Sequence, residues 1–243
     1  MDTYFVNYAD HEISYSFRYP STYKYFKKYI NKSDKDNADC TASDEKLERV
    51  RAILPDNVSD DFVEYRSMIG MTAKELLKYH CCLFHAVSFT FQNHAWLLTA
   101  PSGTGKTTQY KNWKKMYPEE IEMICGDIPV ISMNERQISI HPSSWNGKEN
   151  YGNMISAPLG GVIILQQGHQ NTIEKMPVSE AILPMMNQFI SLPDTEQQVQ
   201  SLISILDCIL DQYPVYKMIN DGSLDSTRML REFIEREISN EKV

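Results

Sequence analysis

The stretch "TAPSGTGKTT", residues 99–108, decides the fold prediction. Its glycines let the backbone approach an oxyanion closely, and the lysine and threonine that follow supply an ammonium and a hydroxyl group. The apolar run "AWLLTA" (95–100) precedes it and the helix-forming run "GKTTQYKNWKKMY" (105–117) follows it. A strand, a glycine-rich loop and a helix in this order are typical of a phosphate-binding loop, so the sequence predicts a nucleotide site here.

The loop departs from the usual pattern GxxxxGK[ST] at its first position, where Ala100 stands for glycine. Alanine costs some backbone freedom but removes no phosphate donor. Pro101 lacks an N–H, yet the amides that would cradle phosphate lie at 103–107. We therefore predict a competent loop, with Lys106 on the outer phosphates and Thr107 on Mg²⁺. The predicted binding residues are Ser102, Gly103, Thr104, Gly105, Lys106, Thr107 and Thr108.

Outward from the loop, strand-like and helix-like segments alternate, which predicts an α/β fold with a mixed sheet flanked by helices. Residues 71–243 are expected to form this nucleotide-binding domain, and residues 1–70 a small β-rich region without catalytic residues or with a role in substrate docking. "TAKELLKYHCCLF" (72–84) has helical spacing, with Thr72 as a candidate N-cap. Further strands are expected within 85–91, 122–133, 136–142, 157–168 and 214–219, and helices within 178–190, 195–213 and 223–238.

The composition of the chain argues against some classes of function. The 243 residues carry a net charge of −8, and the sequence pI is about 5.3. This balance argues against general binding to nucleic acid or to an anionic membrane. The five cysteines show no zinc-type spacing and are expected to be free thiols. No signal peptide or membrane-spanning run is evident, so we expect a cytoplasmic protein.

The motif "SGTGKTT" (102–108) resembles the phosphate loop of ATP-dependent PEP carboxykinase and of the related HPr kinase/phosphorylase proteins. Residues 72–243 are similar to small HPr kinase-like proteins, including a subgroup whose middle reads like "HPSSWNGKEN" (141–150) and "SAPLGGVIILQQG" (156–168). The resemblance implies a PEP carboxykinase/HPr kinase-like P-loop core. Some of these relatives phosphorylate a serine on a ribosomally made peptide. HPr kinases are often multimeric, which leaves a homo-oligomer open.

Two further residues are candidates for the chemistry. Asp127 follows a predicted strand, at the end where open α/β sheets build their crevices, and we predict that it acts as base and metal ligand. The family has an acidic pair here, whereas this chain reads Gly126-Asp127. His85 lies fifteen positions before Ala100, a spacing similar to the family's, and could orient Asp127 or contact phosphate. The alternative for His85 is a core or surface histidine.

A second informative stretch is "SSWNGKEN" (143–150), where Asn146-Gly147 marks a tight turn. The turn would project Trp145 and Lys148. Lys148 could neutralise the transferred phosphoryl group, and Trp145 could stack on the base or line the acceptor cleft. The alternative is a surface hairpin with a buried tryptophan.

These residues together predict a kinase that uses ATP and Mg²⁺ to phosphorylate a hydroxyl, by expectation a serine, on a protein or peptide. Two other functions stay open. A nucleotide-dependent module could hold a peptide or protein without transfer, and the missing acidic residue at Gly126 favours that reading. A small-molecule kinase could use the same scaffold.

Overall fold

The structure, a computed structural model, describes residues 2–190 and 193–240. The chain divides into two compact units. Unit 1 comprises residues up to 83 together with 190–204, and unit 2 comprises 84–189 together with the chain from 205 onward. Each unit is described by itself below.

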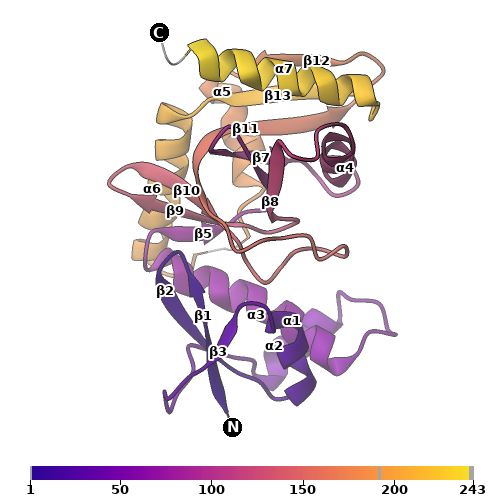
Figure 1. The fold of residues 1–243 in the computed structure, drawn as a ribbon. Helices are drawn as coiled ribbons and strands as arrows, with labels where there is room; N and C mark the ends of the chain where they lie inside the picture. The colour runs from indigo at the N-terminus through magenta and orange to yellow at the C-terminus, as the bar shows by residue number, and fades with distance from the viewer. Residues whose placement is uncertain (1, 191–192, 241–243) are drawn as a thin grey trace. The chain divides into compact units, whose positions relative to one another are not determined.

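Unit 1 combines a small sheet with helices (Figure 1). The strand order is β3-β1-β2-β4, in which β1 is antiparallel to β2 and β3, and β2 is parallel to β4. The buried side chains of Tyr15, Phe26, Met68 and Leu76 form part of its core. The elements are β1 (Thr3–Tyr8), β2 (His11–Ser16), a 3₁₀ turn (Pro20–Thr22), α1 (Tyr23–Phe26), β3 (Ile30–Lys32), β4 (Cys40–Thr41), α2 (Asp44–Arg51), α3 (Asp60–Leu77) and β5 (Cys81–Leu83).

The helix expected over 72–84 is placed differently. Helix α3 begins at Asp60 after the N-cap Ser59, and Thr72 lies buried inside it, with its hydroxyl 2.7 Å from the Tyr15 hydroxyl. The helix ends at Leu77 because His80 adopts a left-handed φ of 53°, which a continuing helix cannot accommodate. The expected β-rich region 1–70 therefore differs from unit 1, which carries two helices longer than its strands and extends to residue 83.

Unit 2 is built on a curled mixed sheet (Figure 1). Strand β7 is parallel to β11, and β11 is parallel to β13, while β6 is antiparallel to both β7 and β8. Strands β9 and β10 form a hairpin, and β10 continues the sheet beside the start of β11. The strands are β6 (Val87–Phe91), β7 (His94–Thr99), β8 (Ile121–Cys125), β9 (Val130–Asn134), β10 (Gln137–His141), β11 (Ala157–Gln167), β12 (Thr172–Lys175) and β13 (Val215–Asn220).

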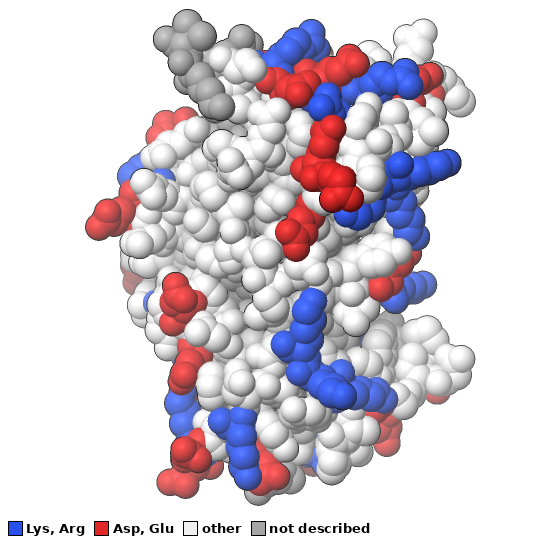
Figure 2. Space-filling model, in the orientation of Figure 1, with Lys and Arg blue, Asp and Glu red and all other residues white. Residues whose placement is uncertain are grey.

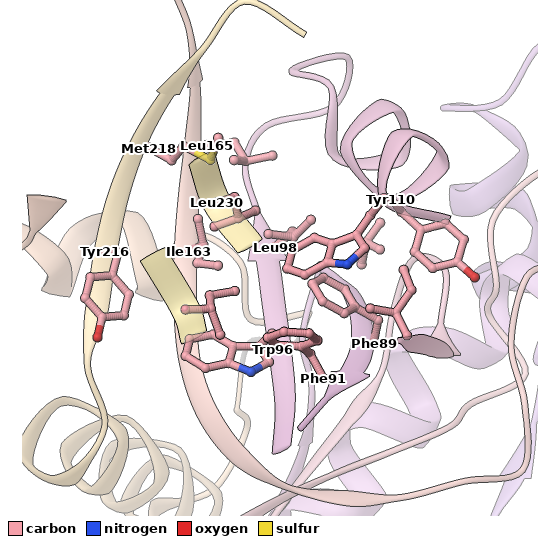
Figure 3. Close-up of a cluster of buried hydrophobic side chains, with 14 of the residues drawn as sticks. Phe89, Phe91, Trp96, Leu98, Tyr110, Ile163, Leu165, Tyr216, Met218 and Leu230 are labelled. Carbon is pink, nitrogen blue, oxygen red and sulfur yellow. The ribbon is translucent and has the colours of Figure 1, made fainter. Parts of the chain in front are cut away.

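Helices α4 (Lys106–Met116) and α7 (Leu224–Asn240) cover one face of this sheet. Their apolar residues, among them Trp113 and Leu230, pack with Phe89, Trp96 and Ile163 from the strands in one buried cluster (Figure 3). The other helices of the C-terminal half are α5 (Val178–Met186) and α6 (Glu196–Gln212), and α6 runs from unit 1 into unit 2. The prediction of a mixed sheet flanked by helices is confirmed.

Two details of the sequence prediction need correction or completion. The strand expected over 122–133 is two strands, β8 and β9, because the chain turns at residues 126–129. Strand β12 was not expected. All five cysteines are free and buried, as predicted for thiols that form no disulfide. None of the helices in the described part of the chain combines the length and the apolar character that crossing a bilayer requires.

Candidate active site

Three segments meet at one edge of the unit 2 sheet. Strands β7, β8, β11 and β13 run in the same direction, since β6 is antiparallel to both of its neighbours. The loop after β7 and residue Asp127 after β8 therefore lie at the carboxyl edge, and His85, just before β6, lies there too. This is the edge at which open α/β sheets bind ligands.

The loop after β7 has the backbone of an anion site. Gly103 and Gly105 adopt left-handed φ values of 83° and 106°, which residues with a Cβ rarely adopt. Helix α4 begins directly at Lys106, and no side chain caps its N-terminus. The amides of Lys106, Thr107 and Thr108 have no carbonyl acceptor within the helix, so they can bind phosphate oxygens.

The buried environment of Ala100 explains why this position need not be glycine. Its side chain is 1% exposed and belongs to the buried cluster beneath α4. The position therefore contributes packing at the end of β7, while the left-handed residues that shape the loop lie further on at Gly103 and Gly105.

Lys106 is held at the mouth of the loop. Its side chain is only 8% exposed, and Nζ donates to the carbonyl oxygens of Ala100 at 2.7 Å and Pro101 at 3.4 Å. Burial lowers the pKa of this ammonium, and the charge of Asp127 opposes that shift. An anionic ligand in the loop would therefore compete with the two carbonyl oxygens for this ammonium group.

Buried amide and hydroxyl groups fix the first turn of α4 to α7. Gln109 is fully buried; its Nε2 donates to Ser226 Oγ at 2.7 Å, and its Oε1 accepts from Thr227 Oγ1 at 2.9 Å. Both partners lie in α7. These bonds hold the first turn of α4, and with it the loop, against the second helix.

Asp127 and His85 form a pair beside the loop. His85 Nε2 lies 3.5 Å from Asp127 Oδ1, and His85 Nδ1 lies 3.2 Å from Gln188 Oε1. Backbone bonds fix both residues, because Ala86 N donates to the Asp127 carbonyl and His85 N to the Gln188 carbonyl. Thr99 Oγ1 donates to the His85 carbonyl at 2.8 Å. The two side chains remain partly exposed, at 25% for His85 and 32% for Asp127.

A steric restriction at Gly126 explains why Asp127 has no acidic neighbour at this position. A Cβ at Gly126 would lie 2.6 Å from the Asn146 carbonyl oxygen and 2.9 Å from that of Tyr151. Both obstacles are backbone atoms, which do not move as a flexible side chain does. The fold of the 143–151 segment therefore excludes a second carboxylate beside Asp127.

The turn at Asn146-Gly147 exists, and Gly147 adopts a left-handed φ of 71°. A Cβ there would lie 3.3 Å from the Asp127 Cβ, so the turn packs against the acid. The expectation that the turn projects Trp145 is wrong, because this side chain is 1% exposed and its carbonyl accepts from Ile128 N. Lys148 follows the turn and is exposed to solvent.

The residues present fit a nucleotide bound with Mg²⁺. Within 2–190 and 193–240, no group of three or more His, Cys, Asp or Glu gathers as a metal cage. Mg²⁺ rarely needs one, since it is commonly held by one or two carboxylates together with substrate phosphates and water. Asp127 is partly exposed and Thr107 is half-buried at the start of α4, so both remain accessible as ligands.

Sequence reasoning missed several residues that support the site, among them Gln188 and Gln167. Gln188, at the end of the α5 segment, is separated from His85 by 103 positions, and Gln167 Nε2 donates to the Gly103 carbonyl at 3.2 Å. Neither lies in a motif. The face shown in Figure 2 carries Lys and Arg side chains interspersed with Asp and Glu. Lys111 and Glu149 form an ion pair at 2.9 Å.

Comparison with known proteins gives a distant structural likeness. No protein-family model matches the chain, and no curated protein matches it in sequence. Among solved structures, the Hpr(Ser) kinase/phosphatase from Coxiella burnetii is similar over 66% of this chain and 99% of its own, with 10% sequence identity and a TM-score of 0.38. At that distance the likeness carries no weight for the chemistry of this chain, which has to be inferred from the site itself.

Proposed function

We propose that unit 2 is an ATP- and Mg²⁺-dependent kinase that transfers the γ-phosphoryl group to a hydroxyl, by preference a serine, of a protein or peptide. The observation that carries the proposal is the loop from Ala100 to Gly105, with its two left-handed glycines, next to the buried Lys106 and the Asp127–His85 pair. A cradle for phosphate and a carboxylate able to accept a proton are the main parts that phosphoryl transfer requires of a protein.

Each residue has a distinct task in this proposal. The amides at residues 103–108 bind the phosphate oxygens, and Lys106 leaves its carbonyl partners to neutralise them. Asp127 accepts the proton of the acceptor hydroxyl as the new O–P bond forms and the bond to the ADP oxygen breaks. His85 keeps the carboxylate of Asp127 oriented. Mg²⁺, held by Thr107 and Asp127, would neutralise charge on the phosphates.

Lys148 remains a candidate in this proposal. Its backbone adjoins Gly147, which packs against Asp127, and its side chain is exposed. An alternative is a module that binds nucleotide without transfer. The observation that favours this alternative is Gly126, where the fold has no room for a second carboxylate.

The proposal is tested by incubating the protein with γ-labelled ATP, Mg²⁺ and an extract of its host cells, with the Lys106→Ala variant as control. Label in a protein or peptide that requires Lys106 supports the kinase. Label only in a small metabolite indicates a small-molecule kinase. Tight MgATP binding without any transfer indicates the binding module.

A further inference from the structure

A pocket of about 530 Å³ opens beside the loop, wholly within unit 2. Ala100, Pro101 and Thr104 of the loop form one wall. Leu183 and Pro184 of α5 form another. A volume in this range accepts a small molecule or a short segment of polypeptide, so the pocket has room for more than one side chain.

The chemistry of the pocket is uncharged. None of the described residues that line it carries a charge. The lining combines aliphatic groups, such as those of Leu183 and Ile164, with side-chain amides, such as those of Gln166 and Asn187. Such a lining favours an apolar side chain flanked by groups that hydrogen-bond to amides, which describes a stretch of polypeptide, and it disfavours a charged metabolite.

The pocket is linked to the Asp127–His85 pair through two of its lining residues. Gln188 lines the pocket and contacts His85 Nδ1, and Thr99 lines it and donates to the His85 carbonyl. The same two residues thus belong both to the pocket wall and to the support of the pair. The pocket therefore adjoins the residues that support the pair.

One large apolar side chain of the pocket lining is exposed on α5. Leu183 lines the pocket and is 66% exposed. Exposed apolar groups that border a pocket are a common mark of a binding surface.

We propose that this pocket binds the acceptor polypeptide through a bulky apolar residue close in sequence to the phosphorylated hydroxyl, with Leu183 as the main contact. This inference rests on the proposed kinase function and adds the acceptor's recognition element to it. The amides of Gln166 and Asn187 would bind the backbone on either side of that apolar residue.

The test selects displayed peptides with a fixed serine and randomised flanks on the full-length protein with MgADP, and needs no phosphoryl transfer. Selected peptides are then measured on Leu183→Gln, with Met186→Gln as the matched control on the same helix but outside the pocket lining. Both changes are neutral and lie at exposed positions, so neither alters charge near the phosphates or removes a buried group. Asn187→Ala, at a second exposed lining position, gives an independent check.

We expect the selected peptides to share Leu, Ile, Met or Phe at one position near the serine. Their affinity should fall about tenfold in Leu183→Gln, the loss expected for one apolar side-chain contact, and remain unchanged in Met186→Gln. Selection without an apolar preference, or equal affinity for Leu183→Gln and the wild type, overturns the proposal. Weaker MgATP binding by Leu183→Gln also overturns it, because the pocket then serves the nucleobase. If the peptides bind but take no label from γ-labelled ATP, the pocket assignment stands and the kinase proposal fails.

Discussion

Two carboxylates, one in each unit, show what separates a structural acid from an available one. Glu64 of α3 is fully buried, and its oxygens accept from Arg18 N at 2.7 Å, Tyr19 N at 3.1 Å and Thr22 Oγ1 at 2.5 Å. Asp127 of unit 2 keeps 32% of its side chain in solvent and faces His85 at 3.5 Å. The first is saturated by its own unit, whereas the second retains lone pairs for a ligand. Acidic residues of the same class thus serve the fold in unit 1 and, in our account, the chemistry in unit 2.

Among the variants that test the functional role of unit 2, Lys106→Ala is expected to have the largest effect on activity. The variant removes the buried ammonium of the loop, so kcat/KM for transfer should fall about 10⁴-fold and MgATP affinity about tenfold. Steady-state kinetics and calorimetric titration with MgATP measure the two. Lys111→Ala is the matched control, because Lys111 lies exposed on the same helix and pairs with Glu149. Unchanged transfer in Lys106→Ala would remove the loop from the mechanism.

The next largest effect is expected from Asp127→Asn. The amide keeps the size of the side chain but cannot accept the proton, so turnover should drop about 10³-fold while MgATP affinity changes by only a few-fold. Single-turnover transfer and nucleotide titration separate the two quantities. Turnover within a few-fold of the wild type would mean that another residue is the base.

Glu64→Leu should act on stability. Three donors lose their buried acceptor, so we expect the free energy of unfolding to fall by about 3 kcal/mol. Urea denaturation followed by circular dichroism measures this loss, and Glu64→Gln, which keeps an acceptor oxygen, should lose less. An unchanged midpoint in Glu64→Leu would contradict the view that this carboxylate is structural.

Alanine substitutions at two glycines near the site should lower stability by different amounts, both smaller than the loss in Glu64→Leu. Gly126→Ala places a methyl group against two backbone carbonyls and should cost about 2 kcal/mol of stability. Gly103→Ala meets open space, so only its left-handed φ of 83° opposes it, at about 1 kcal/mol. Denaturant midpoints of the two variants give the comparison. Equal losses would mean that the contacts at Gly126 can relax.

The loop could be predicted from sequence because its signals are local. Gly103, Gly105 and Lys106 lie within four positions of one another, and each residue type has a direct physical reason there. Asp127 was placed at the sheet edge from the order of strands and helices, and His85 was singled out by its spacing from Ala100, which is similar to the family's. The structure brings these two side chains together. Their roles in transfer stay predictions.

The rest depended on contacts between distant parts of the chain. Nothing near Gln188 in the sequence indicates that it contacts His85, 103 positions away. Trp145 looked available on a turn, but the packing of the 143–151 segment against β8 buries it. The start of α3 was missed because the pattern around Thr72 was read as a helix beginning, although the buried positions Val63 and Met68 already belong to the same helix.

The most direct test of the account is a crystal structure with magnesium and a non-hydrolysable ATP analogue. We expect the triphosphate against the amides of residues 103–108, Lys106 moved from the Ala100 carbonyl onto phosphate, and the terminal phosphate facing Asp127. A nucleotide bound elsewhere, or an Asp127 carboxylate turned away from the terminal phosphate, would contradict the account.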